Sequence, residues 1–499
     1  MRTAGVAFLF SMAVAAALTP AVRLFALRRG LLDHALSARK IHGKPIPRLG
    51  GLAIVGGFYA PLVALFVYRT GLGFTLFADR ARLLGLLGGG LAIAGLGLVD
   101  DLRGLGAGVK LLVQLAVALG LYQLGFRIEH LATPWGVPVE LGVLSLPLTL
   151  LWIAGVVNAM NLIDGLDGLA GGVALFALGT TFAIAVFRAE PIMALFSAAL
   201  AGSVAGFLFY NFNPASIFMG DTGSMFLGFI LAAGSIWTHQ KSSTAVALLV
   251  PVVALGLPIA DTLLAILRRA LRGKPLFSAD REHIHHRLLA LGLSHRQAVL
   301  VLYGACVVLG GAALLLSFAN SAQTAAVLSV LSIVGFFAVR RLGLLKAPPA
   351  GHAADEVEPG PAPRALVRTL AERIHRAATQ GEIWDAVKPL LPALRAARLQ
   401  LSLSNVRDSG ERVTTLFQLD GVKAGRTPFL AVFAVGEDAG RLELTWDDGR
   451  AAVEHDHELA AEVLCDHLAA ALARLDAAGQ RATAPAAPAN VIPLSRQKQ

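Results

Sequence analysis

Long apolar runs dominate the sequence, and each is close to the length that a helix needs to cross a bilayer. Such a span requires about 20 mainly apolar residues, and inside a bilayer a helix satisfies its own backbone hydrogen bonds. The expected fold class is therefore an α-helical polytopic membrane protein. About eleven transmembrane helices are predicted, at residues 4–27, 49–68, 83–99, 109–126, 143–159, 168–187, 191–210, 223–238, 245–267, 298–317 and 323–339.

The composition agrees with a membrane protein. Hydrophobic residues make up 56% of the 499 residues, and the mean hydropathy is +0.65. The net charge of +10 would suggest nucleic acid binding in a soluble chain. Here an excess of Lys and Arg in cytoplasmic loops explains it, and no nucleic acid partner is expected. Cys306 and Cys465 are too far apart in the sequence to indicate a disulfide framework or a zinc site.

The loops between the apolar runs predict the orientation. Cytoplasmic loops of membrane proteins are enriched in Lys and Arg. In this chain basic residues concentrate in alternate loops, at 28–48, 100–110, 268–297 and 340–346. This bias places those loops and the C-terminus in the cytoplasm, and the N-terminus outside. The first run, 4–27, is longer than the apolar part of a signal peptide, about 7–15 residues, and is interpreted as a span.

The character of the chain changes after the last apolar run. Residues 1–345 are predicted to form the membrane domain, and residues 346–363, rich in Pro, Ala and Gly, a linker. Residues 364–478 are predicted to form a soluble α+β domain, with helical spacing over 366–394, four strands and a closing helix over 458–475. This order resembles a GAF-like domain. Residues 479–499 are predicted to be disordered.

Two acidic motifs lie at the ends of apolar runs. Asp100 and Asp101 end the third run, and adjacent carboxylates favour a cation beside them. Asp164 and Asp167 lie three residues apart in a Gly-rich stretch, and would share a face if it were helical. Each motif has a structural alternative: a hydrated acidic helix end for the first, and a helix-packing turn for the second.

Two further polar motifs fall on the same predicted side. Asp221 begins the eighth run and follows Phe218, which could offer an aromatic surface to a nucleobase; Asp is also a common helix N-cap. His283, His285 and His286 form a cluster beside arginines that could bind phosphates. A zinc site and a basic loop near anionic lipid are the alternatives for the histidines. Together the motifs favour Mg²⁺ and a phosphorylated, partly lipidic substrate.

The ordered motifs resemble the polyprenyl-phosphate N-acetylhexosamine-1-phosphate transferases, or glycosyltransferase family 4. The resemblance covers residues 1 to about 340. It rests on Lys44 with Arg48-Leu-Gly-Gly51, Asp100-Asp101, Asn158 through Asp164 to Asp167-Gly168, Asn211 with Phe218-Met-Gly-Asp221-Thr-Gly-Ser224, and His283-Ile-His285-His286. The histidine loop resembles the branch that starts surface glycans. Phospho-MurNAc-pentapeptide transferases usually carry three consecutive histidines there.

The resemblance implies roles for particular residues. Asp100, Asp101 and Asp164 are implied as catalytic, and Mg²⁺, or Mn²⁺ in its place, would be held by Asp221, Asp100 and Asn161. Asp100 or Asp101 would deprotonate the lipid phosphate, or a covalent aspartyl intermediate would form. The implied substrate-binding residues are Lys44, Asn161, Asp167, Asn211, Phe218, Arg281, His283, His285 and His286.

The function implied by the resemblance is transfer of N-acetylhexosamine 1-phosphate, GlcNAc-1-phosphate first of all, from a UDP-sugar to undecaprenyl phosphate. The products would be the lipid diphosphate sugar and UMP, at the bacterial inner (plasma) membrane with the site facing the cytoplasm. The alternatives are a phospho-MurNAc-pentapeptide transferase and a multi-span transporter, which would place charges near the membrane centre. A regulatory ligand or protein at the C-terminal domain and a homodimer are the further partners considered.

Overall fold

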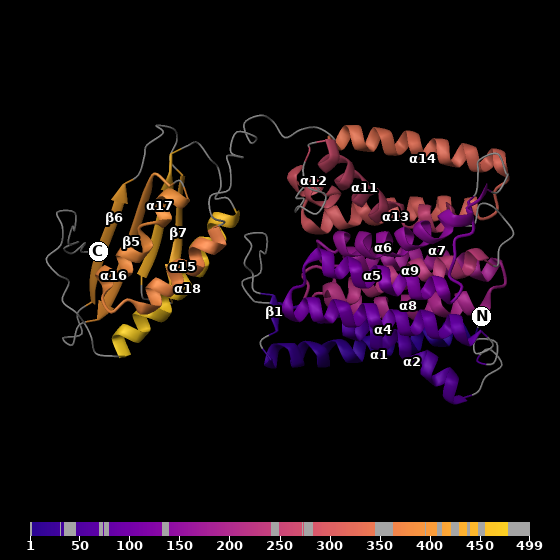
Figure 1. Ribbon diagram of the computed structural model, residues 1–499, viewed down its shortest axis with the longest axis horizontal. Helices are drawn as coiled ribbons and strands as arrows, with labels where there is room; N and C mark the ends of the chain where they lie inside the picture. The colour runs from indigo at the N-terminus through magenta and orange to yellow at the C-terminus, as the bar shows by residue number, and fades with distance from the viewer. Residues whose placement is uncertain are drawn as a thin grey trace. The chain divides into compact units, whose positions relative to one another are not determined.

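The computed structural model divides the chain into two compact units. It describes residues 2–29, 31–33, 46–68, 73, 79–131, 139–240, 249–271, 273, 283–344, 363–394, 396–406, 412–420, 429–436, 440–447 and 455–477. The described residues of the first unit, up to Leu344, are almost entirely helical (Figure 1). Those of the second, from Pro363, form an α+β unit.

The described residues of the eleven predicted apolar runs are largely helical in the first unit. The helices are α1 (Arg2–Arg28), α2 (Gly51–Tyr68), α4 (Arg80–Arg103), α5 (Ala107–Gln123), α6 (Ser145–Ile163), α7 (Leu169–Phe187), α8 (Pro191–Asn211), α9 (Gly220–Gln240), α10 (Leu249–Ala254), α11 (Gly256–Leu271), α12 (Ile284–Ala290), α13 (His295–Leu316) and α14 (Ser321–Leu342). Within the described residues, 7 helices are long and apolar enough to cross a membrane. These helices indicate a membrane protein, while eleven crossings stay a prediction.

The ninth predicted span is not one helix. It consists of α10 and α11, with Leu255 in a turn between them. Pro258 has no backbone N–H, so it cannot donate to the carbonyl of Ala254, the last residue of α10. The break therefore has a local cause in the sequence, and it leaves α11 as a separate amphipathic helix that ends in Arg268 and Arg269.

The centre of the first unit is built around α8 and α9. Of the apolar segment of α8, 83% is buried, against 6% for the corresponding segment of α14, which runs along the edge of the bundle (Figure 1). Successive helices run in opposite directions, so the end of α4, the start of α5, the end of α6, the start of α7, the end of α8 and the start of α9 meet at one end of the bundle. All the acidic motifs of the sequence lie at this end.

Glycines allow the helices to touch at this end of the bundle. A Cβ atom on Gly97 of α4 would lie 2.4 Å from the backbone oxygen of Asp221, and one on Gly51 would lie 2.2 Å from the backbone nitrogen of Gly223. Both obstacles are main-chain atoms of α9, which cannot turn aside as a side chain can. The first turn of α9 is thus held directly against α2 and α4.

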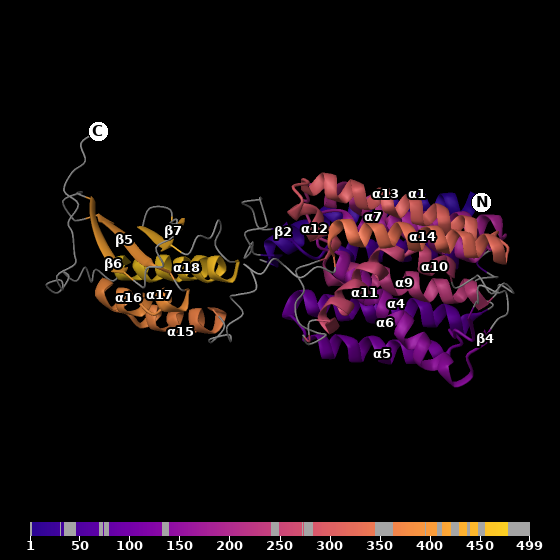
Figure 2. The same cartoon turned by 90° about the horizontal axis from the view of Figure 1, so that it is seen from above.

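The second unit has a four-stranded antiparallel sheet in the order β6-β5-β8-β7. Its strands are β5 (Arg398–Val406), β6 (Arg412–Asp420), β7 (Phe429–Val435) and β8 (Gly440–Trp446). Helices α15 (Pro363–Arg376), α16 (Gln380–Val387), α17 (Leu390–Ala393) and α18 (His455–Ala477) lie on one face of the sheet (Figure 2). Alternate leucines, such as Leu399, Leu401 and Leu442, are buried between the sheet and the helices.

The predicted strands of this unit lie where the structure has them, within two or three residues. The single helical stretch predicted over 366–394 is instead three helices, because Thr379 caps α16 through its side chain and so starts a new helix. The likeness to GAF domains, the linker at 346–363 and the domain boundaries stay predictions. The segment 479–499 lies outside the described residues.

Gly97→Ala should destabilise the first unit. The added methyl group would meet the backbone of Asp221, and overpacking of this kind costs about 1–3 kcal/mol. Gly95 on the same helix has no atom within 4 Å of an added Cβ, so Gly95→Ala is the matched control. Thermal unfolding in detergent should show a lower midpoint for Gly97→Ala alone. Equal midpoints would contradict the tight contact between α4 and α9.

Candidate active site

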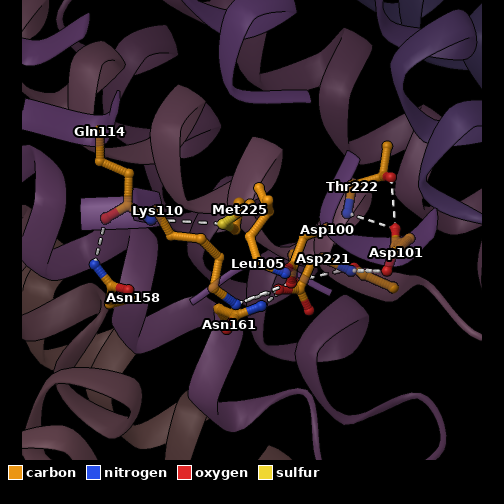
Figure 3. A network of polar contacts seen from close by, with 12 residues as sticks. Asp100, Asp101, Leu105, Lys110, Gln114, Asn158, Asn161, Asp221, Thr222 and Met225 are labelled. Carbon is orange, nitrogen blue, oxygen red and sulfur yellow. Dashed lines mark hydrogen bonds and ion pairs between the residues drawn. The ribbon is translucent and has the colours of Figure 1, made fainter. Parts of the chain in front are cut away.

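A lysine joins two of the predicted acidic residues. The Nζ atom of Lys110, in the first turn of α5, lies 2.9 Å from Oδ2 of Asp100 and 2.9 Å from Oδ2 of Asp221 (Figure 3). Asp100 also accepts a hydrogen bond from the backbone N–H of Leu105, at 2.5 Å. The ammonium group thus lies between carboxylates from α4 and α9, and offsets the repulsion of two anions that face one point.

Asp101 has a different environment from its neighbour. Its Oδ1 accepts from the backbone N–H of Asp221 at 2.9 Å, and its Oδ2 accepts from the backbone N–H and the hydroxyl of Thr222, at 3.0 and 2.6 Å. These donors belong to the first turn of α9, where N–H groups have no partner within the helix. Gly220, with φ of 71°, makes the sharp entry to that helix. Asp101 therefore fixes the start of α9, and with it Asp221.

Amide side chains line the adjacent part of α6. Nδ2 of Asn161 donates to the Ser224 hydroxyl at 3.0 Å and also bonds the Asp221 carboxylate. One turn earlier, Nδ2 of Asn158 donates to Oε1 of Gln114 at 2.6 Å. Figure 3 shows these groups continuing the polar network away from the acidic residues, between α5 and α6. Asn161 is thus close to the carboxylate that it was predicted to assist.

The stretch that carries Asp164 and Asp167 is a turn between α6 and α7, and it is not helical. The two carboxylates therefore do not share a helix face. Burial, and then the charges of Asp221, Asp101 and Asp167, raise the pKa of Asp164 to about 8. Asp164 thus lies within electrostatic range of three other carboxylates, and a bound cation would favour its ionised form.

Asp167 and Asn211 hold two loops together. Oδ2 of Asp167 accepts from Nδ2 of Asn213 and from the backbone N–H of Ala215, both at 3.0 Å. Asn211 is buried; its Oδ1 accepts from the backbone N–H of Gly168 at 3.1 Å and its Nδ2 donates to the carbonyl of Ile217 at 2.9 Å. These bonds position the loop that leads to Phe218. A role for either side chain in holding uridine stays a prediction.

Phe218 lies at the junction between this loop and the segment before α2. Its backbone N–H donates to the carbonyl of Pro47 at 2.8 Å, and its carbonyl accepts from the backbone N–H of Gly50 at 2.9 Å. The side chain is partly exposed, and the adjacent Met219 is fully buried. The pairing with residues 47–50 therefore fixes the backbone of Phe218 just before the first turn of α9.

The three histidines lie together at the start of α12. The rings of His283 and His285 are stacked with centroids 5.7 Å apart, and those of His285 and His286 are 4.0 Å apart. Nε2 of His285 is so close to Gly165 that a Cβ there would lie 2.4 Å from it. The histidine cluster is thus packed against the turn that carries Asp164 and Asp167. Lys44 and Arg281, the other predicted substrate-binding residues, lie outside the described residues.

Sequence reasoning missed two residues of the site. Lys110 was counted as a loop residue, although a lone lysine at the start of an apolar run is a signal for a buried partner. Asp261 lies within the ninth apolar run, and its side chain is buried beside His283. An acidic residue inside such a run marks a functional position by default, so its sequence position alone could have identified it.

The donor chemistry at Lys110 fits a hard divalent cation. Carboxylate and amide oxygens are the ligands that Mg²⁺ prefers, and Mg²⁺ usually keeps water or phosphate oxygens as further ligands. Asp100 and Asp221 direct one oxygen each to a single point, which the ammonium group of Lys110 takes. Among the described residues, no three His, Cys, Asp or Glu side chains form a ready-made metal cluster. These residues therefore suit a cation that shares its ligands with a substrate.

Asp101→Asn should lower stability. An amide nitrogen in place of one carboxylate oxygen would face donors, so an N–H of α9 would lose its acceptor, at a cost of about 1–3 kcal/mol. Arg103→Gln, an exposed change in the last turn of α4, is the control. Thermal unfolding of the purified variants measures the difference. An unchanged midpoint for Asp101→Asn would argue against its role at the start of α9.

Comparison with known proteins identifies the family. The family model for Glycosyl transferase family 4 matches residues 83–239. A Bacillus subtilis (strain 168) protein named "Probable undecaprenyl-phosphate N-acetylglucosaminyl 1-phosphate transferase" is 42% identical over 299 residues, 60% of this chain and 80% of the relative. The "Decaprenyl-phosphate N-acetylglucosaminephosphotransferase" of Mycolicibacterium smegmatis is 39% identical over 66% of this chain and 86% of its own length.

A more distant relative has another substrate in its name. The "Phospho-N-acetylmuramoyl-pentapeptide-transferase" of Bacillus mycoides is 33% identical over 57% of this chain and 88% of its own length. The relatives named for N-acetylglucosamine thus share more residues with this chain than the one named for N-acetylmuramoyl-pentapeptide. The family match, the identities and the site geometry agree: the chain belongs to glycosyl transferase family 4.

Proposed function

We propose that this protein transfers N-acetylglucosamine 1-phosphate from UDP-N-acetylglucosamine to a polyprenyl phosphate, undecaprenyl phosphate first of all, and releases UMP. An oxygen of the lipid phosphate forms a bond to the phosphorus that carries the sugar, and the bond from that phosphorus to UMP breaks. The single observation that carries the proposal is the meeting of Asp100, Lys110 and Asp221 at one end of a membrane helix bundle. The names of the relatives at 42% and 39% identity support the choice of sugar.

Asp100 and Asp101 have different roles in this proposal. Both oxygens of Asp101 are occupied by donors from α9, so it acts as a support. Oδ2 of Asp100 contacts the ammonium group of Lys110, which is at the end of a long side chain. Asp100 is therefore the carboxylate better placed to accept a proton from the lipid phosphate. Lys110 would then be free to contact phosphate oxygens, as lysines at phosphate sites do.

Mg²⁺, or Mn²⁺, is proposed as the cofactor. Asp221, Asp100 and Asn161 would hold it, because their oxygens are hard donors from three adjacent helices. When bound, such an ion neutralises charge on transferring phosphoryl groups. The histidine cluster, beside the turn at Gly165, would contact the diphosphate, and Phe218 would stack on uracil. Lys44 and Arg281 are proposed as further contacts from the sequence alone.

The cellular setting is also part of the proposal. The basic loops favour a cytoplasmic location for the site end of the bundle, in the bacterial inner membrane. The C-terminal unit is proposed to bind a regulatory ligand or protein, by its likeness to GAF domains, and the homodimer stays a prediction. Transport is a weaker alternative, because the acidic residues lie at helix ends. Transfer of phospho-MurNAc-pentapeptide is the runner-up, supported by the 33% relative.

Purified protein in detergent with undecaprenyl phosphate should release UMP from UDP-N-acetylglucosamine. UDP-GalNAc and UDP-MurNAc-pentapeptide, tested as competing donors, should be used at least 10-fold less efficiently. Turnover with UDP-MurNAc-pentapeptide alone would establish the runner-up. No UMP from any donor would reject the transferase proposal. EDTA should abolish turnover and added Mg²⁺ should restore it. Asp221→Asn should lower kcat at least 100-fold, which corresponds to a barrier higher by about 2.7 kcal/mol.

The orientation can be tested with introduced cysteines. Arg103, beside the acidic network, and Glu140, at the other end of the bundle, are both exposed. In intact cells, an impermeant thiol reagent should label Glu140→Cys and spare Arg103→Cys, whereas both should react in opened cells. The native Cys306 and Cys465 are buried, which keeps the background low. The opposite labelling pattern would place the site outside.

A chain ending at Ala347 should still transfer sugar phosphate. All described residues of the acidic network and the histidine cluster lie in the first unit, whose core is separate from that of the second unit. UMP release by the truncated protein in detergent should stay within about threefold of that of the full chain. Background turnover by a truncated protein that keeps the full-length unfolding midpoint of its membrane unit would assign the C-terminal unit to catalysis.

A further inference from the structure

The carboxylate of Asp261 is buried and has polar partners. It is on α11, its exposed fraction is 2%, and its neighbour His283 is 5% exposed. Oδ2 of Asp261 lies 3.0 Å from Nδ1 of His283, and Oδ1 accepts the backbone N–H of Ile284 at 2.8 Å. Each carboxylate oxygen thus has a partner. An unpaired carboxylate at this depth would be costly, so the pair with His283 is what allows Asp261 to be there.

The same bonds fix the start of α12. His283 is the N-cap of this helix, yet its side chain makes no capping bond, because the imidazole is turned to Asp261. Oδ1 of Asp261 instead accepts from Ile284, the first residue of α12. A helix of 7 residues is marginal by itself. Asp261 therefore supplies, from another helix, the cap that holds the segment carrying His285 and His286.

The contact also determines which nitrogen of His283 can act. A carboxylate accepts hydrogen bonds and cannot donate when ionised, so Nδ1 carries the proton toward Asp261. Nε2 is then the nitrogen left for another group. Partners of this kind orient a histidine ring and fix its tautomer, and at metal-binding histidines their loss typically costs about 10- to 100-fold in affinity or activity. The ring of His285 is stacked on that of His283 and lies against the turn at Gly165.

We propose that Asp261 is a positioning residue of the transfer reaction, which holds His283 by Nδ1 and starts α12 so that the three histidines face the donor diphosphate. The inference rests on the proposed function. Asp261 touches no reacting atom in this account. It acts through His283. Its loss should therefore weaken the binding of the UDP-sugar more than it slows the reaction of the bound complex.

A kinetic cycle tests the assignment. Asp261→Asn keeps the size and an oxygen for the Ile284 N–H, but its amide cannot accept from Nδ1–H as a carboxylate does. We expect kcat/KM for UDP-N-acetylglucosamine to fall about 10- to 100-fold, chiefly through KM. His283→Asn should cause a similar loss. If Asp261 acts through His283, the double variant should be no worse than His283→Asn alone.

Two further variants separate this role from simple packing. Thr262 lies next to Asp261, and its buried hydroxyl bonds no described residue, so Thr262→Val should keep wild-type kinetics within twofold. Ile284→Pro removes the backbone donor together with the partly buried isoleucine side chain. Proline is tolerated at this first-turn position, and His283 with ψ of 155° already has the conformation required before proline. The variant should keep most of the activity if the imidazole contact is the important one.

The outcomes are distinguishable. Wild-type kinetics for Asp261→Asn, or losses that multiply in the double variant, would overturn the inference and leave the proposed function standing. Absence of UMP release by the wild-type protein would overturn both. If Asp261→Asn does not fold, His283→Asn is the variant that tests the inference. The amide nitrogen of the introduced asparagine can replace the Nδ1–H donor to Asp261, but the variant has no equivalent of Nε2. A wild-type unfolding midpoint with lost donor affinity supports the inference, and retained affinity refutes it.

Discussion

The ammonium group of Lys110 is the contact on which the site depends. In a bilayer, charged groups persist where they are paired, and Lys110 contacts Asp100 and Asp221 at 2.9 Å each. It thereby joins the end of α4, the start of α5 and the start of α9. Without it, two carboxylates would face each other across a helix contact that Gly97 makes too tight for intervening side chains.

The neighbouring carboxylates have different roles, although their sequence motifs look similar. Asp101 and Asp167 accept hydrogen bonds from backbone N–H groups and hold the first turn of α9 and the loop before Phe218. Asp100 and Asp221 each direct Oδ2 to the side chain of Lys110, and these two oxygens can meet a cation or a phosphate when the ammonium group moves. A buried acidic residue is thus satisfied either by rigid donors, which make it structural, or by exchangeable ones, which leave it available for chemistry.

The histidine cluster follows the same rule at the other side of the site. Asp261 gives His283 a rigid partner and leaves His285 against the turn at Gly165. The break between α10 and α11 at Leu255 matters here, because it separates the helix that carries Asp261 from the apolar segment before it. A continuous ninth helix would give α11 a different direction and would remove Asp261 from its place beside α12.

The sequence by itself predicted the helical membrane unit, the α+β unit and most of the residues that the structure brings together at one end of the bundle, because apolar length and clustered acidic residues are local properties that a bilayer makes decisive. It could not assign roles among Asp100, Asp101 and Asp167, since these depend on donors from α5, α9 and the loop after α8. The partners of Lys110 and Asp261 were decided only in the folded chain, where Asp261 lies 3.0 Å from an imidazole that is 22 residues away in the sequence. Helix packing decides which distant residues pair, and local sequence patterns do not predict that packing.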